Sequence, residues 1–114
     1  MYFTEIINRL VVQLGAVFRS VASKRKLTFS QTLTLLSIPF DGIAISSLAN
    51  LLGLDTSTLS RNIDKLNTMG LVHRKTSLND SRIILIVLSS SGKKVVDNLE
   101  LDLEHKNFNI LKNI

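Results

Sequence analysis

Residues 48–66 read LANLLGLDTSTLSRNIDKL, and this stretch decides the fold. Apolar residues at helical spacing mark one face of each of two short helices: Leu48, Ala49, Leu51 and Leu52 in the first, and Leu59, Ile63 and Leu66 in the second. Gly53 suits the position after a helix end, where positive φ is common, and Asp55 is a favoured N-cap. We therefore predict two short helices around a tight turn, the second ending at Met69-Gly70.

A further helix is predicted upstream of this pair. Thr28 and Gln31 have the spacing of a capping box, in which each side chain accepts a hydrogen bond from the other residue's backbone N–H. The helix that they open should stop before Pro39, which disfavours helical backbone in the residue before it. The next helix starts near Ala44, which has no side-chain acceptor, so we expect Ser46 or Ser47 to cap it.

Downstream of the pair, the pattern changes to that of a hairpin. Residues 71–76 and the β-branched, apolar residues 82–88 predict two strands, with the polar residues 77–80 at the tip. Ser89-Ser90-Ser91-Gly92 should separate the second strand from a last helix.

Both ends of the chain predict long helices with unusually wide apolar faces. Residues 1–26 carry apolar side chains at spacings of three and four, and residues 93–114 carry a seam at Val96, Leu99, Leu103, Ile110 and Ile114. Such helices should touch two surfaces, their own domain and a second subunit. The predicted fold is mainly α, in the α+β winged-helix class: one domain with an N-terminal dimerisation helix (1–26), a winged helix-turn-helix with a two-stranded wing (27–92) and a C-terminal dimerisation helix (93–114).

Composition excludes several classes of protein. The 114-residue chain has no cysteine, which excludes a disulfide scaffold, a thiol redox sensor and a Cys-ligated zinc site. It has no Gly-rich phosphate loop and no catalytic triad signature, so we expect neither an enzyme nor a cofactor nor a metal site. The longest charge-free apolar run, Ile83–Leu88, has six residues, so we expect no membrane span and a cytoplasmic protein.

The net charge of +5 is unevenly distributed. Residues 1–43 carry +3, residues 44–94 carry +4, and residues 95–114 carry −2. A basic body with an acidic last segment favours a polyanionic partner for the body, although a charge excess that only aids solubility would give the same total.

Several short motifs occur in the order found in one family of regulators. They are Leu27-Thr28-x-x-Gln31, Leu48-Ala49-x-x-Leu52-Gly53-Leu54, Ser57-Thr58-Leu59-Ser60-Arg61-x-Ile63-Asp64-x-Leu66, Gly70-Leu71-Val72-x-Arg74, Asn79-Asp80-Ser81-Arg82 and Leu88-Ser89-x-x-Gly92. Together they resemble the MarR family of transcription regulators. The resemblance implies a homodimeric winged helix that binds pseudo-palindromic double-stranded DNA, commonly as a repressor, and that a small aromatic or anionic effector can release. The effector would lie between the dimer helices and the winged domain, where Arg19 and Lys24 supply cations. The alternative is a winged-helix interaction module or anti-regulator that pairs with another regulator.

The outward face of the second short helix carries the first group of candidate DNA contacts. These are Ser57, Thr58, Ser60, Arg61 and Lys65. Hydroxyls near a helix N-terminus can bond phosphates or base edges, an arginine can address guanine O6 and N7, and a lysine one turn later suits a phosphate. A merely solvated helix face would show the same residues.

The hairpin carries the second group. Asp80 and Arg82 share one face of the strand, so Asp80 could hold Arg82 extended for a narrow minor groove, or the two could form only a local pair. Arg74 and Lys75 are candidate phosphate contacts, with solvation as the rival. His73 and His105 have no second ligand at metal-binding spacing, so we expect no zinc there.

Overall fold

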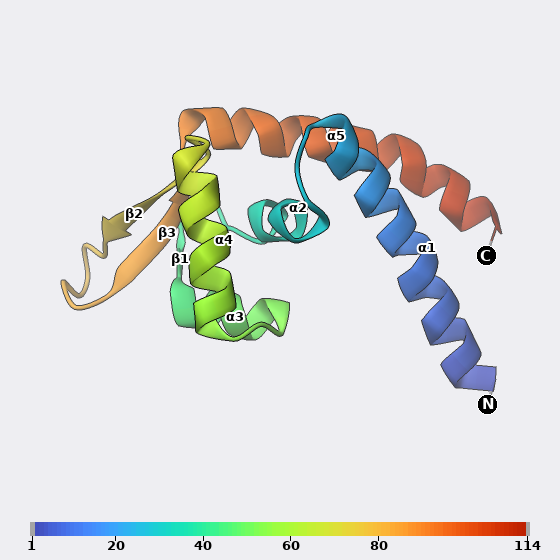
Figure 1. Ribbon diagram of the computed structural model, residues 1–114, viewed down its shortest axis with the longest axis horizontal. Helices are drawn as coiled ribbons and strands as arrows, with labels where there is room; N and C mark the ends of the chain where they lie inside the picture. The colour runs from blue at the N-terminus through green and yellow to red at the C-terminus, as the bar shows by residue number, and fades with distance from the viewer. Residues whose placement is uncertain (1, 114) are drawn as a thin grey trace.

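The computed structural model describes the backbone of residues 2–113 and the side chains of residues 2–105. This part of the chain forms five helices and a small sheet. The sheet lies at one end of the molecule, and α1 lies at the other (Figure 1). The elements are α1 (Tyr2–Lys24), α2 (Phe29–Leu36), β1 (Ile43–Ala44), α3 (Ile45–Leu52), α4 (Thr56–Thr68), β2 (Val72–Thr76), β3 (Ile84–Leu88) and α5 (Ser90–Asn113). The predicted α+β winged-helix fold is confirmed.

The helix ends follow mostly from local side-chain chemistry. The Thr28 side chain accepts from the Gln31 backbone N–H at 3.0 Å, and the Gln31 side chain accepts from the Thr28 N–H at 2.9 Å, which completes the predicted capping box. Asp55 caps α4, and Gly53 ends α3 with φ 67°. The expected Ser46 or Ser47 cap is wrong: Ala44 is the N-cap and makes no side-chain bond.

The start of α3 is held by strand pairing instead of a side-chain cap. β1 pairs antiparallel with β3, with Ile43 opposite Ile86 and Ala44 opposite Leu85. The sheet therefore has three strands in the order β1-β3-β2, one more than predicted. A strand of two residues is too short to leave an alternating pattern in the sequence, so this strand was missed. The two wing strands are each slightly shorter than expected.

One continuous core joins the elements of the winged helix. Leu35, Leu48, Leu59, Ile63, Leu66 and Ile86 are fully buried. The terminal helices contribute Val21 and Ala22 of α1 and Leu99 of α5 to this core, and neighbouring residues such as Val17 and Val96 pack against it. Leu99 is the buried member of the predicted seam, and Ile110 and Ile114 lie outside the described side chains.

The junction between the wing and α5 differs from the prediction. Ser91 and Gly92 do not separate two elements; they lie in the first turn of α5, which Ser89 caps by accepting from the Gly92 N–H at 2.9 Å. The Ser89 hydroxyl also donates to the Gly70 carbonyl at 2.5 Å. A Cβ at position 92 would lie 2.0 Å from the Leu71 carbonyl oxygen, so only glycine fits this close approach.

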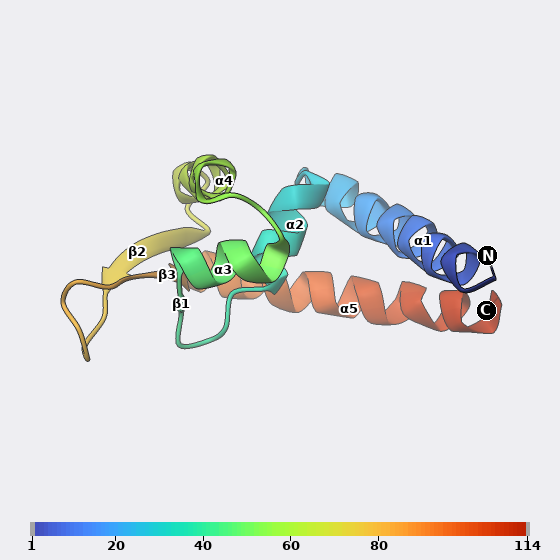
Figure 2. The ribbon, with the colours of Figure 1, turned by 90° about the horizontal axis from the view of Figure 1, so that it is seen from below.

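The N-terminal part of α1 leaves its apolar side chains exposed. Figure 1 shows α1 and α5 diverging toward the two ends of the chain, and Figure 2 shows both extending away from the winged helix. Exposed apolar residues on α1 are Tyr2, Phe3, Ile6, Ile7, Val11, Val12 and Leu14. By length and composition alone, α1 is long and apolar enough to cross a membrane. The expectation of no membrane span rested on uninterrupted apolar runs, and charged residues interrupt the apolar residues of α1. Core helices and N-terminal signal sequences meet the same test.

Candidate nucleic-acid interface

The outward face of α4 is set by the residues that it buries. Leu59, Ile63 and Leu66 have no exposed area, so the opposite side of the helix faces solvent. Of the predicted contacts on this helix, Ser57, Arg61 and Lys65 are exposed and Thr58 and Ser60 are half-buried. The structure thus brings this group together on one face, as the helical spacing requires.

Asp55 already occupies the positive end of the α4 dipole. Its carboxylate accepts from the Ser57 hydroxyl at 2.6 Å, from the Thr58 backbone N–H at 2.7 Å and from the Thr58 hydroxyl at 2.9 Å. These bonds, that from Ser57 first, lower the pKa of Asp55 from 3.8 to about 2. Because both hydroxyls donate their protons to Asp55, Ser57 and Thr58 can only accept further hydrogen bonds. They therefore suit a base amino group better than a phosphate.

Arg61 and Lys65 are available for a ligand. Arg61 donates one long hydrogen bond within the described part of the chain, from Nη2 to the Thr58 hydroxyl at 3.4 Å. Among the described residues, no ion pair links Arg61 or Lys65 to a carboxylate. The two side chains lie about one turn apart on α4, so they can address adjacent groups of one polyanion.

Arg74 connects the wing to α4. Its guanidinium donates to Asp64 of α4 at 2.8 Å, and the arginine side chain is 38% exposed. Pairing with Asp64 places the charge of Arg74 beside the outward face of α4. The sequence offers no sign of this role for Asp64, which is exposed on α4, because its partner lies ten residues away and in another element.

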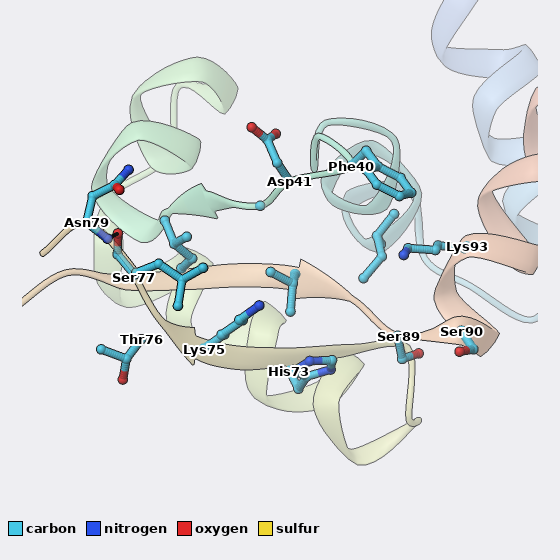
Figure 3. A pocket seen from close by; sticks show the side chains of 15 residues that line it. Phe40, Asp41, His73, Lys75, Thr76, Ser77, Asn79, Ser89, Ser90 and Lys93 are labelled. Carbon is cyan, nitrogen blue, oxygen red and sulfur yellow. Dashed lines mark hydrogen bonds between the residues drawn. The ribbon is translucent and has the colours of Figure 1, made fainter. Parts of the chain in front are cut away.

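Lys75 does not join this group. It follows Arg74 in β2, and successive side chains of a strand point to opposite faces. Lys75 and His73 line a groove on the side of the sheet away from α4 (Figure 3). The two residues predicted together as phosphate contacts therefore lie on different faces of the wing.

The wing tip presents an arginine held in a fixed pose. Arg82 donates from Nε to Asp80 Oδ1 and from Nη2 to Asp80 Oδ2, both at 3.1 Å, and its backbone N–H donates to Oδ1 at 3.0 Å. These bonds lower the pKa of Asp80, the side chain of Arg82 contributing most. The Arg82 side chain remains 88% exposed. The predicted Asp80–Arg82 arrangement is present.

Asn62 is a positioning residue that the sequence did not reveal. Its side-chain amide donates to Ser30 Oγ at 2.7 Å and to Thr34 Oγ1 at 3.3 Å. These bonds fix α4 against α2, so the orientation of the exposed face depends on the first helix of the winged domain. A polar residue on the flank of an amphipathic helix gives no signal of such a partner.

Comparison with known proteins assigns the chain to a family. The sequence profile of the transcriptional regulator SarA/Rot family matches residues 16–99, which span α2 to the wing and parts of both terminal helices. The chain belongs to the SarA/Rot family of transcriptional regulators. A search of curated protein sequences found no match.

Solved structures agree with this SarA/Rot-family assignment at the level of the fold. Wild-type MarR from E. coli in its apo form is 24% identical, with a TM-score of 0.81 over 96% of this chain and 83% of MarR. A mutant MepR from S. aureus bound to an oligodeoxyribonucleotide is 22% identical, with a TM-score of 0.70 over 99% of this chain and 82% of MepR. CouR from Rhodococcus jostii bound to p-coumaroyl-CoA is 20% identical, with a TM-score of 0.84 over 96% of this chain and 78% of CouR. The regulator therefore has a MarR-type winged-helix fold, as the sequence motifs indicated.

Proposed function

We propose that this regulator binds double-stranded DNA as a homodimer, with α4 in the major groove and the wing tip in an adjacent minor groove. The observation that carries the proposal is the presence of two exposed arginines on one winged helix, one on α4 and one at the wing tip. Arg61 lies on the outward face of α4 and forms no ion pair with a carboxylate of the described residues, and Arg82 is held out from the wing tip by Asp80. An arginine can bond guanine O6 and N7 in the major groove and can enter a narrow minor groove.

The remaining candidate contacts have distinct roles in this arrangement. Lys65 neutralises a phosphate, Arg74 reaches the backbone between the two grooves, and Ser57, Thr58 and Ser60 read or position bases near the start of α4. A mutant MarR from E. coli that is 23% identical to this chain, with a TM-score of 0.81, was solved in complex with operator DNA, which supports DNA binding by a chain with this fold. By occupying such a site the protein would act as a repressor in the cytoplasm, without catalysing a reaction.

The apolar faces of α1 and α5 support the homodimer. Val11 and Val12 of α1 are 64% and 57% exposed, and Leu101 of α5 is 58% exposed. Large apolar side chains that gather on an exposed surface mark an interaction site. A second copy that packs on the diverging helices would bury it and would relate the two winged helices by a two-fold axis, which calls for a pseudo-palindromic DNA site.

An effector site is supported by one feature near Arg19. The Arg19 guanidinium lies over the ring of Phe29, 4.6 Å from its centroid. Phe29, with Leu33, Leu52 and Leu54, lines an apolar pocket of about 350 Å³. A cation beside an apolar pocket suits a small aromatic anion, and we propose that such a compound releases the regulator from DNA. Stabilisation by salicylate in a thermal-shift assay tests this part separately.

The main experiment is selection of bound duplexes from random DNA, followed by fluorescence anisotropy with the selected site. Arg61→Ala should weaken binding by about 1–3 kcal/mol and relax preference at particular base pairs, whereas Lys65→Ala should weaken all sequences alike and reduce the salt dependence. Arg82→Ala should lose most affinity where AT-rich flanks surround the site. A stable monomer that ignores duplex DNA would overturn the proposal and favour the interaction-module alternative.

A further inference from the structure

The face of the wing opposite α4 is hollowed. A groove of about 750 Å³ runs from the hairpin tip to the start of α5 (Figure 3). Leu85 and Val87 of β3 form part of its floor, and the loop through Phe40 and Gly42 forms one wall. Gly42 has φ 91°, and a Cβ there would lie 2.7 Å from a Val87 methyl group, so this wall is packed closely onto the sheet.

The groove is lined by cations that have no acidic partner. Lys75 of β2 and Lys93 of α5 extend toward the hollow from two sides, with the imidazole of His73 nearby (Figure 3). Among the described residues, neither lysine forms an ion pair, whereas Arg74 and Arg82 on the same hairpin are both paired. Asp41 is the one carboxylate of the lining, and its carboxylate points away from the lysines (Figure 3). The groove therefore presents two lysine charges that no ion pair with a described residue neutralises.

Exposed apolar side chains stand at both ends of the groove. Phe40 is 82% exposed, and the Lys93 ammonium lies 4.3 Å from its ring centroid. Leu78, at the hairpin tip, is 92% exposed. The groove thus combines two lysines with an exposed aromatic ring and an exposed leucine. Such a mixed apolar and cationic surface suits a partner segment that is both apolar and acidic.

The length of the groove distinguishes between kinds of occupant. The strand and turn from His73 to Leu78 line it, which at about 3.4 Å per residue corresponds to roughly 17 Å. An extended peptide of about five residues spans this distance, whereas a compact anion would touch only one part of it. An extended chain also places alternate side chains on the same face, so acidic and apolar residues can meet the lysines and the end residues together.

We propose that this groove is a docking site for a short, extended acidic segment of a partner protein, with carboxylates at Lys75 and Lys93 and apolar side chains against Phe40 and Leu78. Because the groove lies on the face of the wing away from α4, the partner can bind while α4 contacts DNA. The site would connect the regulator to another protein at the promoter, and its test does not depend on DNA binding.

The test uses the full chain and a fluorescein-labelled peptide of alternating glutamate and leucine, six residues long, in fluorescence anisotropy. Lys75→Gln and Lys93→Gln should each weaken binding about two- to fivefold, as expected for partly exposed ion pairs. Lys94→Gln is the matched control, because Lys94 is the exposed neighbour of Lys93 and does not line the groove, and it should change binding less than either. Phe40→Ser should weaken binding about fivefold through lost apolar contact.

Two control peptides and one competitor complete the design. Peptides with glutamine for glutamate, or with serine for leucine, should bind more weakly than the parent. Equal loss in the Lys93→Gln and Lys94→Gln variants would show a response to net charge only and would overturn the proposal. Displacement of the peptide by an equal concentration of phenyl phosphate would assign the groove to a small anion instead. Loss of duplex DNA binding in Lys93→Gln as large as in Arg61→Ala would assign these lysines to the DNA interface.

Discussion

The winged helix and the two terminal helices use similar apolar residues and place them very differently. In the winged helix, residues such as Leu59, Ile63 and Leu66 lie in one core with no exposed area. On α1, most apolar residues from Tyr2 to Leu14 face solvent: apart from the half-buried Leu10, the large ones are between 37% and 79% exposed. The same helical periodicity therefore produces a closed core in one region and an open surface in the other.

This difference shows which part of the molecule is self-sufficient. The winged helix covers its own apolar faces with helices from both sides and with the sheet, and polar bonds such as Asn62 to Ser30 fix the packing. The terminal helices pack on each other and on the core near one end, and they diverge toward the ends of the chain (Figure 1). The apolar residues near the start of α1 therefore stay exposed. We therefore expect substitutions in the two regions to affect different properties: unfolding in the winged helix, and assembly in the terminal helices.

The largest effect should come from Leu59→Ala in the core of the winged helix. Removing a fully buried leucine leaves a cavity beside α4, which should lower the free energy of unfolding by about 3–5 kcal/mol. Urea denaturation at fixed protein concentration measures it. Val11→Ala is the control, since it removes apolar atoms from an exposed site, and we expect a far smaller change in the urea midpoint. Similar losses in the two variants would mean that the two regions do not differ as proposed.

A second large effect is expected at the joint between the two regions. Gly92→Ala would drive a methyl group against the Leu71 carbonyl, and overpacking of this kind costs about 3 kcal/mol. Urea denaturation followed by circular dichroism measures the loss.

Gly70→Ala provides the comparison, because Gly70 has φ 77° but no atom within 4 Å of an added Cβ. That variant should show only backbone strain, about 1–2 kcal/mol. If Gly70→Ala were the more damaging of the two, the close packing of α5 on the end of α4 would not be what holds the joint.

Assembly should respond to a charge on α1. Val11→Glu places a carboxylate in the exposed apolar face and should raise the dimer dissociation constant at least about tenfold, because burying an unpaired charge is costly. Sedimentation velocity over a concentration series measures the change. Asn8→Glu adds the same charge at an exposed polar position on α1 and should leave the constant nearly unchanged. A Val11→Glu variant that dimerises normally would show that the second copy does not use this face.

Most of the winged helix could be predicted because its determinants are local. The capping box at Thr28, the glycine at position 53 and the helical spacing of Leu59, Ile63 and Leu66 each act within a few residues of themselves. β1 could not be predicted, because its two residues become a strand only when β3 lies beside them. The first turn of α5 was misread for a similar reason: the four residues 89–92 are a helix start because Ser89 and Gly92 meet the end of α4.

The candidate site was predictable in its residues and less so in its geometry. The helical period placed Arg61 and Lys65 on one face, and the two-residue spacing of Asp80 and Arg82 brought their side chains together. The partner of Arg74 and the separation of Lys75 from Arg74 required the structure, since both depend on how the wing sits against α4. A single sequence does not indicate which distant residues form an ion pair, or which face of a short hairpin packs against a helix.

The smallest effect that we predict concerns Asp55, the N-cap of α4. The pKa of Asp55 is about 2 in the folded chain against an ordinary value of 3.8, because Ser57 and Thr58 donate to the ionised carboxylate. A depressed pKa stabilises the fold at pH values above 3.8, and this contribution is lost as the pH falls from 3.8 toward 2. Asp55→Asn should therefore lower the thermal midpoint at neutral pH, and the difference from the unsubstituted protein should shrink between pH 4 and pH 2. Ser57→Ala should give a weaker form of the Asp55→Asn profile, since Ser57 is the largest cause of the shift. A pH-independent difference for Asp55→Asn would instead mean that the cap acts through its geometry and not through its charge.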